Sequence, residues 1–351
     1  MQLSAMLRLK MSWTRAGSPR SEVVVSSRIR LARCLRSHPF PGRSSPKTLA
    51  AALEETAAAA RKTRALGDAA CIRLSEIDAV DRLFLIERHL ISRNLAETPQ
   101  HRAVVVGEQE VLSLMINEED SLRMQGIDAG LCLEDLLVRV SALDDELAAS
   151  LDFASHPQWG YLTACPTNVG TGLRASCLVH LPGLGLLGEI NPVLEKLSGL
   201  GVSVRGLYGE GTKVMGDFYQ ISNASTLGPS EEDFTRRMTR VVESLAESEL
   251  RARKNLAKKE ALRLEDLVYR SLGTLQNARF LPYEEALHHL SLMRLALSLG
   301  WRVGVDMGTL NEWTALARPG HLQMREGRLL QPEERDALRA GLLRDLFNSK
   351  S

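Results

Sequence analysis

The chain has 351 residues, which is enough for one large domain or two of ordinary size. Its 44 lysines and arginines balance 43 aspartates and glutamates, so no net field favours nucleic acid or an acidic membrane surface. No apolar run approaches the ~20 residues that a membrane span needs. Five cysteines without Cys-x-x-Cys spacing argue against a disulfide framework or a zinc site, and favour a cytoplasmic protein.

The first part of the chain mixes strand and helix patterns. Residues 1–21 are polar and predict a flexible N-terminal segment. Apolar runs predict strands at residues 22–25, 71–74, 103–106 and 111–116. The strands at residues 103–106 and 111–116 are expected to form a hairpin. Helical periodicity marks residues 47–66 and residues 76–90, with Ser75 as the N-cap of the second helix.

The rest of the chain becomes progressively more helical. Helices are expected at residues 131–151, 174–181, 190–200 and 231–269, and strands at residues 202–204 and 219–222. This order predicts an α+β fold: a mostly antiparallel sheet flanked by helices, followed by an α-helical C-terminal domain. We expect a catalytic domain at residues 22–254 and the helical domain at residues 255–351.

Arginines recur in short segments that also contain turn-forming residues or a carboxylate. They are Arg28, Arg30, Arg33, Arg123, Arg174 and Arg205. A guanidinium group stays charged and presents a planar fork of donors that fits phosphate oxygens two at a time. The pattern predicts a site that folding assembles around a polyphosphate, and hence nucleotide-dependent phosphoryl transfer.

An acidic run, Asn-Glu-Glu-Asp, occupies residues 117–120. In an extended segment Glu119 would oppose Glu118 and Asp120, so one carboxylate could serve as a general base or anchor a cationic substrate. The alternative is an acidic turn in solvent. The segment 165–172 is dense in turn residues, and Cys165 there is either a thiolate beside cations or a buried cysteine before a loop.

Two nucleotide-binding motifs are nearly matched and are rejected. Residues 205–213 contain Glu210 and a Gly-Thr-Lys order, whereas a P-loop requires Gly-Lys followed by Ser or Thr. Residues 183–188 match Gly-x-Gly-x-x-Gly but follow Pro182 and an expected helix, whereas a dinucleotide site needs a preceding strand.

Taken together, these segments resemble the catalytic domain of the phosphagen (guanidino) kinases, with motifs in family order at residues 27–33, 117–123, 165–176, 205–210 and 222–228. The resemblance implies that Glu119 and Glu210 hold and activate a guanidinium group and that Cys165 lies close to the substrate. It implies ATP-binding positions at Ser27, Arg28, Ile29, Arg30, Leu31, His89, Arg123, Arg174, Ala175, Ser176, Cys177, Leu178, Arg205, Gly206, Leu207, Tyr208, Gly209 and Glu210. Mg²⁺ is expected to bind mainly through the nucleotide, without dedicated protein ligands. Ser121 stands where the family usually has His, and Cys34 where Asn is usual.

Two features indicate a branch of the family. The first motif comes almost at the start of the chain, where phosphagen kinases have a helical domain that grips a small substrate. The segment 335–340, Arg-Asp-Ala-Leu-Arg-Ala, resembles the signature of bacterial protein arginine kinases. That resemblance implies a regulatory phosphoarginine-binding pocket at Arg335, Asp336, Arg339 and Ala340. The spacing alone favours a solvated basic face of a helix instead.

The implied reaction is transfer of the γ-phosphoryl group of Mg-ATP to arginine side chains of proteins, giving Nω-phosphoarginine. A guanidino kinase acting on free arginine is the first alternative, and a catalytically inactive adaptor is the second. The resemblance further implies protein substrates with exposed arginine, a stress-response role with an unfoldase–protease, and an activator protein. The leucine-rich C-terminal part favours a homodimer. No nucleic-acid or membrane partner is expected.

Overall fold

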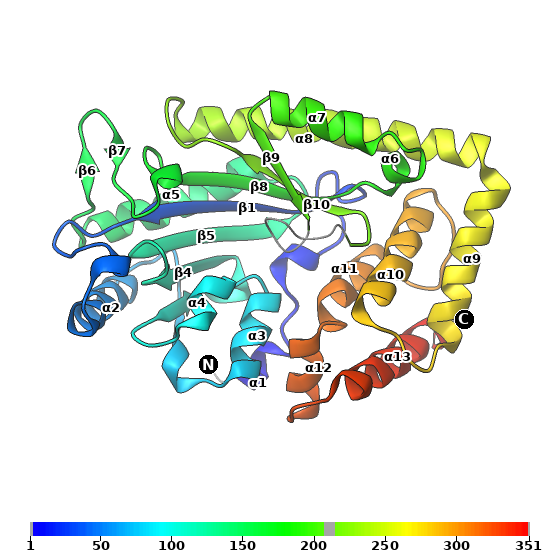
Figure 1. Cartoon of the computed structure of the whole chain (residues 1–351), viewed down its shortest axis with the longest axis horizontal. Helices are drawn as coiled ribbons and strands as arrows, with labels where there is room; N and C mark the ends of the chain where they lie inside the picture. The colour runs from blue at the N-terminus through cyan, green and yellow to red at the C-terminus, as the bar shows by residue number, and fades with distance from the viewer. Residues whose placement is uncertain (1–2, 207–214, 350–351) are drawn as a thin grey trace.

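The computed structural model describes residues 3–206 and 215–349. Its centre is an eight-stranded sheet in the order β2-β3-β4-β5-β1-β8-β10-β9, and every neighbouring pair is antiparallel (Figure 1). The strands are β1 (Val24–Arg33), β2 (Ala70–Arg73), β3 (Ala103–Val106), β4 (Leu112–Ile116), β5 (Leu122–Ala129), β8 (Leu173–His180), β9 (Val202–Gly206) and β10 (Phe218–Asn223). A separate small hairpin pairs β6 (Ser155–His156) with β7 (Gly160–Tyr161).

Helices flank the sheet and form the C-terminal part of the molecule. The first group is α1 (Leu3–Met6), α2 (Pro46–Ala60), α3 (Ala79–Glu87), α4 (Arg93–Glu97), α5 (Leu133–Ala148), α6 (Pro182–Leu186), α7 (Ile190–Gly199) and α8 (Glu231–Lys259). The C-terminal group is α9 (Ala261–Asn277), α10 (Tyr283–Ser298), α11 (Met307–Leu316), α12 (Pro319–Glu326) and α13 (Pro332–Asn348). The expected α+β class, with a mostly antiparallel sheet and a helical C-terminal region, is confirmed.

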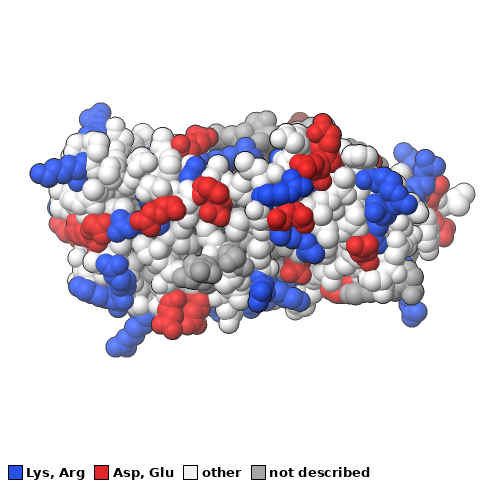
Figure 2. Space-filling model, turned by 90° about the horizontal axis from the view of Figure 1, so that it is seen from below, with Lys and Arg blue, Asp and Glu red and all other residues white. Residues whose placement is uncertain are grey.

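Acidic and basic side chains are interspersed on the face of the molecule that Figure 2 shows. Figure 2 shows the molecule from below, with small groups of both signs next to each other and no broad area of one sign on that face. No helix within residues 3–206 and 215–349 combines the length and the apolar character needed to cross a lipid bilayer.

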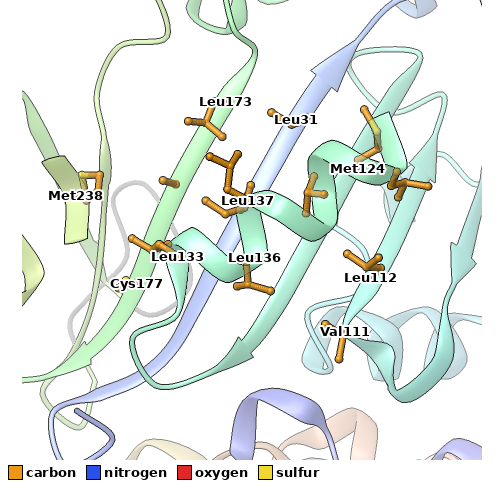
Figure 3. Close-up of a cluster of buried hydrophobic side chains, with 14 of the residues drawn as sticks. Leu31, Val111, Leu112, Met124, Leu133, Leu136, Leu137, Leu173, Cys177 and Met238 are labelled. Carbon is orange, nitrogen blue, oxygen red and sulfur yellow. The ribbon is translucent and has the colours of Figure 1, made fainter. Parts of the chain in front are cut away.

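One face of the sheet is an apolar layer covered by α5 and α8. Leu133, Leu136 and Leu137 of α5 point toward side chains such as Leu31 and Leu173 on the strands below (Figure 3). Each such side chain, once fully buried, stabilises the fold by roughly 1.5–3 kcal/mol relative to exposure. Because strand side chains alternate, this layer commits every second residue of β1 to the core and turns the others to the opposite face.

The opposite face is covered only at its margins among the described residues. α3 packs Phe84 and Leu85 against Val104 of β3 and Met115 of β4. At another margin, an apolar cluster joins the N-terminal segment, the sheet and the C-terminal helices through Met11, Trp13, Val25, Ile127, Phe218, Leu287 and Ala315. The sheet positions between these margins carry the arginines described below.

The N-terminal segment differs from the expectation of a flexible tail. Trp13 is 1% exposed, and the hydroxyl of Ser12 donates to the carbonyl of Ile127 at 3.0 Å. The polar residues of the segment 1–21 concealed the apolar side chains that anchor it, which are Met6, Met11 and Trp13.

Two further local predictions were wrong. Residues 174–181 form most of strand β8 instead of a helix, because pairing with β1 and β10 on both sides outweighs the local pattern. Helix α3 begins three residues later than Ser75 suggested. Asp78 is its N-cap and accepts from the amide of Asp81 at 2.8 Å within a capping box.

Candidate active site

The register of the central strands places five predicted arginines on one face of the sheet. Arg30 of β1 lies opposite Arg174 of β8 on one side and Gln125 of β5 on the other. Arg28 lies two residues before Arg30 in β1, and Arg123 lies two residues before Gln125 in β5. Because side chains alternate along a strand, both arginines share this face. Arg205 of β9 joins them through its pairing with β10, which pairs with β8. The arginines therefore share a face because each sits at the same phase of the strand alternation.

Two arginines of this face, Arg28 and Arg30, are buried close to other guanidinium groups. Burial, with Arg174 and Arg123 nearby, lowers the pKa of Arg28 to about 10. Burial and three neighbouring guanidinium groups likewise hold the pKa of Arg30 well below its usual value, and Glu118 opposes this shift only weakly. The Nε of Arg30 is buried without a hydrogen-bond partner among the described residues. A bound polyanion would supply negative charge beside these guanidinium groups and an acceptor for the Nε of Arg30. The residues present therefore fit a nucleoside triphosphate.

The acidic run forms the tight turn between β4 and β5. Asn117 adopts a left-handed conformation (φ 58°), and its amide donates to the carbonyl of Ser121 at 2.9 Å. The turn separates the carboxylates: the Glu119 side chain is 42% exposed and the Glu118 side chain 2%. Arg123 pairs with both of them, at 2.6 Å from Glu118 and 3.4 Å from Glu119. Of the three carboxylates in this turn, Glu119 is the one exposed to solvent, and the alternative of a fully solvated acidic turn is wrong for Glu118.

The third carboxylate of the run, Asp120, holds the loop that carries Cys165. It is fully buried and accepts from the amide of Ala164 at 2.7 Å and from the side-chain amide of Asn168 at 2.9 Å. The thiol of Cys34 donates to the same carboxylate at 3.4 Å. Glu119 and the cysteine loop are therefore brought together by the residue that follows Glu119 in the sequence.

The cysteines at these positions have different environments. Cys165 is half-buried, with its Sγ 3.0 Å from the hydroxyl of Thr167. Burial and the adjacent Asp120 raise the pKa of the Cys34 thiol to about 12, so Cys34 is a neutral donor at physiological pH. Ser121, the other departure from the family pattern, accepts from the amide of Leu35 at 3.4 Å.

His89 lies at the edge of the same face. The side-chain amide of Gln125 donates to its carbonyl at 2.7 Å, and the ring of Trp13 meets its ring edge-on at a centroid distance of 5.0 Å. Burial, together with the charges of Arg318 and Arg28, holds the pKa of His89 well below its usual range. The imidazole is therefore neutral at physiological pH and suited to contact an uncharged ring.

Several predicted ATP-binding residues have side chains on the other face of the sheet. Five of them alternate with the arginines along the strands: Ser27, Ile29, Leu31, Ala175 and Cys177. Four of these side chains pack in the apolar layer, and the hydroxyl of Ser27 accepts from the backbone amide of Cys132. Ser176 and Leu178 share the arginine face, and Gly206 ends β9. Leu207, Tyr208, Gly209 and the predicted catalytic Glu210 lie outside the described residues.

Arg33, the sixth arginine of the sequence pattern, is not on the arginine face. Its guanidinium group is buried, 2.6 Å from Asp144 and 3.3 Å from Glu231, and it stacks over the ring of Tyr161 at 3.5 Å. Arg33 is at an odd position of β1, whereas Arg28 and Arg30 are at even positions. Strand alternation would therefore have predicted that Arg33 faces the opposite side of the sheet. The same alternation would have found Gln125, two residues after Arg123.

The C-terminal signature residues occupy α13. Arg339 is buried, and its guanidinium group donates to the carbonyls of Ala317 at 2.6 Å and Leu281 at 2.7 Å and to Asp336 at 2.6 Å. Arg335 donates to the carbonyl of Leu330 at 3.2 Å. Ala340 is in the apolar core of the C-terminal helices. The alternative of a solvated basic face is therefore wrong for Arg339.

Within residues 3–206 and 215–349, no group of three or more His, Cys, Asp or Glu side chains is arranged to hold a metal ion. Two cavities in this part of the chain lie away from the arginine face. One, of about 620 Å³, lies between α6 and α10 beside Asp217, and another, of about 490 Å³, lies between α9 and α10 beside His288.

Family models account for most of the chain. "ATP:guanido phosphotransferase, C-terminal catalytic domain" matches residues 52–252, and "Protein-arginine kinase McsB C-terminal domain" matches residues 261–351. Among curated proteins, a protein-arginine kinase of Desulforamulus reducens is 41% identical over 97% of this chain and 96% of its own length. That of Geobacillus stearothermophilus is 43% identical over 95% of this chain and 93% of its own.

Solved structures give the same result for the fold. A lombricine kinase aligns with a TM-score of 0.59 at 25% identity, over 68% of this chain and 69% of its own. The duplicated taurocyamine kinase of Schistosoma mansoni, with transition-state-analogue components bound, aligns with a TM-score of 0.59 at 28% identity, over 67% of this chain and 34% of its own. The chain therefore belongs to the ATP:guanido phosphotransferase family, in its protein-arginine kinase branch, and is a kinase.

Proposed function

We propose that this chain transfers the γ-phosphoryl group of Mg-ATP to arginine side chains of proteins, giving ADP and Nω-phosphoarginine. The observation that carries the proposal is the convergence of five arginines on one sheet face, beside a turn that presents Glu119. A cationic surface suits the triphosphate, and a carboxylate at its margin suits a cationic acceptor.

The arginine face stabilises the charge of the transfer. Phosphoryl transfer depends mainly on positioning and on neutralising the charge spread over the moving group. Arg28, Arg30, Arg123, Arg174 and Arg205 bind the phosphates in this proposal, and the buried donors of Arg30 need no reorganisation to do so. As the bond from the γ-phosphorus to the bridging oxygen breaks, ADP leaves and the bond to the guanidino nitrogen forms.

The acceptor requires a base. A guanidinium group has a pKa above ~12, so its lone pair is unavailable until a proton leaves. In this proposal Glu119 orients the guanidinium group and takes that proton as the N–P bond forms. Glu210, expected as the second carboxylate, lies outside the described residues, and Cys165 lines the acceptor side on the loop held by Asp120.

Mg²⁺ is proposed to bind mostly through phosphate oxygens and water, since the ion keeps several waters in nucleotide sites. It supplies charge neutralisation between the phosphates.

We also propose the division into a catalytic domain of residues 22–254 and a regulatory domain of residues 255–351. We propose that phosphoarginine is recognised by the signature residues Arg335, Asp336, Arg339 and Ala340. In this proposal the ligand displaces the hydrogen bonds that Arg339 donates to the carbonyls of Ala317 and Leu281.

The acceptor is proposed to be a protein instead of free arginine. The near full-length similarity to protein-arginine kinases supports this choice. From the cysteine content we propose a cytoplasmic enzyme, and from the leucine-rich C-terminal part a homodimer. The family resemblance of the motifs supports the proposal that it acts in stress responses with an activator protein and an unfoldase–protease.

The test is to incubate the protein with Mg-ATP labelled at the γ-phosphate and three acceptors: an arginine-rich protein, its counterpart with lysine at every arginine, and free arginine. We expect label on the arginine-rich protein alone, and its loss on mild acid treatment, because a phosphoramidate hydrolyses where phosphoserine persists. Label on free arginine alone would establish the small-molecule kinase instead. No label on any acceptor would support the inactive adaptor.

A further inference from the structure

His89 occupies a backbone position that normally carries glycine. It follows the end of α3 with φ 62°, and two hydrogen bonds close the helix there: the His89 amide donates to the carbonyl of Ile86 at 2.9 Å, and the Leu90 amide to that of Leu85 at 3.0 Å. This is the Schellman arrangement, in which the left-handed residue is usually glycine. A side chain with Cβ is strained in this conformation, so its surroundings must hold it in place.

The residues just before His89 are held by the C-terminal helices. The buried carboxylate of Glu87 accepts from the first amides of α12, at 2.8 Å from Gly320 and 2.9 Å from His321. In return, the guanidinium group of Arg318 donates to the carbonyl of Glu87 at 3.2 Å. A carboxylate at a helix N-terminus is also favoured by the helix dipole. The end of α3 and the start of α12 thus form one reciprocal contact.

This contact has no room for adjustment. A Cβ on Gly320 would lie 2.8 Å from the carboxylate of Glu87 and 2.9 Å from the amide of Phe84. Arg318 is 3% exposed, and its Nε donates to the hydroxyl of Tyr283 and to the carbonyl of Thr314, both at 3.1 Å. Arg318 is therefore fixed by α10 and α11 before it reaches α3.

We infer that Arg318 is a positioning residue for the nucleotide site: it fixes the end of α3 so that the imidazole of His89 stays at the edge of the arginine face. The inference rests on the proposed function, because it takes His89 to contact the nucleotide. ATP binding by the catalytic part then depends on α12, which lies within the separately matched residues 261–351. The helical C-terminal part therefore completes the nucleotide site from outside it.

The experiment compares Arg318→Met with Arg325→Met, an exposed arginine on the same helix that serves as the matched control. Steady-state kinetics on the full-length protein give KM for ATP and kcat separately, and thermal unfolding verifies that each variant is folded at the assay temperature. We expect Arg318→Met to raise KM for ATP by roughly tenfold with kcat within about twofold, and Arg325→Met to leave both unchanged. Gly320→Ala, which displaces α12 without removing a charge, should raise KM in the same direction.

A double variant distinguishes positioning through His89 from a direct effect. His89→Ala alone should raise KM for ATP, and adding Arg318→Met should raise it little further, since the second change then has no imidazole left to displace. Equal KM values for the Arg318 and Arg325 variants, or fully additive effects in the double variant, would overturn the inference. If the wild-type protein phosphorylates no arginine at all, the proposed function fails. If it is active but His89→Ala leaves KM unchanged, only the role of His89 and this inference fail.

Discussion

Glu119 is the side chain proposed as the base for the acceptor. Its carboxylate is 42% exposed and lies 3.4 Å from Arg123 at the margin of the arginine face. Glu119→Gln keeps the shape of the side chain but removes its capacity to take a proton from the acceptor. We expect the rate of arginine phosphorylation to fall by roughly a hundred- to a thousandfold. The affinity for ATP, measured by equilibrium binding, should stay near that of the wild type.

The matched control is Glu134→Gln, which removes an exposed carboxylate at the start of α5, outside the arginine face. Its transfer rate should equal that of the wild type. A Glu119→Gln variant as active as this control would exclude Glu119 as the catalytic base.

Asp120 has a structural role that can be measured separately. Its buried carboxylate accepts hydrogen bonds from Cys34, Ala164 and Asn168. A side-chain amide in its place would have an NH₂ group facing one of these three donors, so that at least one hydrogen bond would be lost. We expect Asp120→Asn to lower the free energy of unfolding by about 1–3 kcal/mol. Urea denaturation measures this, with Asp152→Asn as the control.

Asp152 forms an ion pair with Arg36 in which both side chains are more than half exposed. Exposed pairs of this kind contribute at most about 1 kcal/mol, so this variant should unfold close to the wild-type midpoint. Equal losses in the two variants would show that the buried contacts of Asp120 contribute nothing beyond those of a surface pair.

At this scale the sequence predicted residue types better than residue surroundings. The arginines, Glu119 and Cys165 could be proposed from the sequence because their chemistry is visible in the side chain and in the motif. The burial of Arg33 and the contacts of Asp120 were not, because both depend on which face of a strand or turn a side chain takes. That choice is made by tertiary packing, which local sequence does not specify.

At the scale of secondary-structure elements, helix α5 packs directly on β5 at Gly126. A Cβ on Gly126 of β5 would lie 2.7 Å from a methyl group of Val140 and 3.3 Å from one of Leu136. Gly126→Ala should therefore destabilise the protein by about 1–3 kcal/mol through overpacking. Gly273, inside α9, has no atom within 4 Å of the corresponding position.

Gly273→Ala is the counterpart with the opposite sign. It should stabilise the protein by roughly 0.5–1 kcal/mol, because alanine loses less backbone entropy on entering a helix. Both changes are measured by urea denaturation. Two shifts of the same sign would contradict the packing that the structure assigns to β5 and α9.

The elements themselves were largely predictable where periodicity was sustained. Helix α5 and the hairpin of β3 and β4 agree with the patterns of residues 131–151 and 103–116. Strand β8 was taken for a helix, since a buried strand and a buried helix present similar apolar runs. The expected domain boundary at residue 254 falls inside the continuous helix α8, and this division stays a prediction.

For the molecule as a whole, buried histidines predict how stability changes with pH. Burial, with Arg294 and Arg253 nearby, holds the pKa of His180 well below 6.5. The unfolded chain therefore binds this proton at a higher pH than the folded one. The stability that the neutral ring contributes is fully present above pH 6.5 and is lost as the pH falls from there toward the lowered pKa.

The test is the difference in unfolding free energy between pH 7 and pH 5. His180→Gln should reduce the wild-type loss by up to ~1.4 kcal/mol per pH unit, because one titrating group is removed. His156→Gln, an exposed histidine of the β6 strand, should leave the wild-type loss unchanged. Equal pH dependence in all three proteins would exclude His180 as a source of the effect.

The general architecture was predictable because it follows from the order of patterns along the chain. The contacts between its parts were not. The anchoring of Trp13 against His89 and the docking of α12 on α3 bring together residues separated by roughly seventy to more than two hundred positions. Such pairings depend on shape and burial in the folded state, and no single segment of sequence encodes them.

The two-sided character of β1 restricts how the gene for this protein can evolve. Point changes replace one side chain at a time, and its neighbours can accommodate many of them. Loss of a single codon at residue 28 or 29 would instead shift the rest of the strand by one position, turning Arg30 into the apolar layer beneath α5 and Leu31 toward the arginine face. Natural variation in this strand should therefore consist of substitutions and exclude length changes.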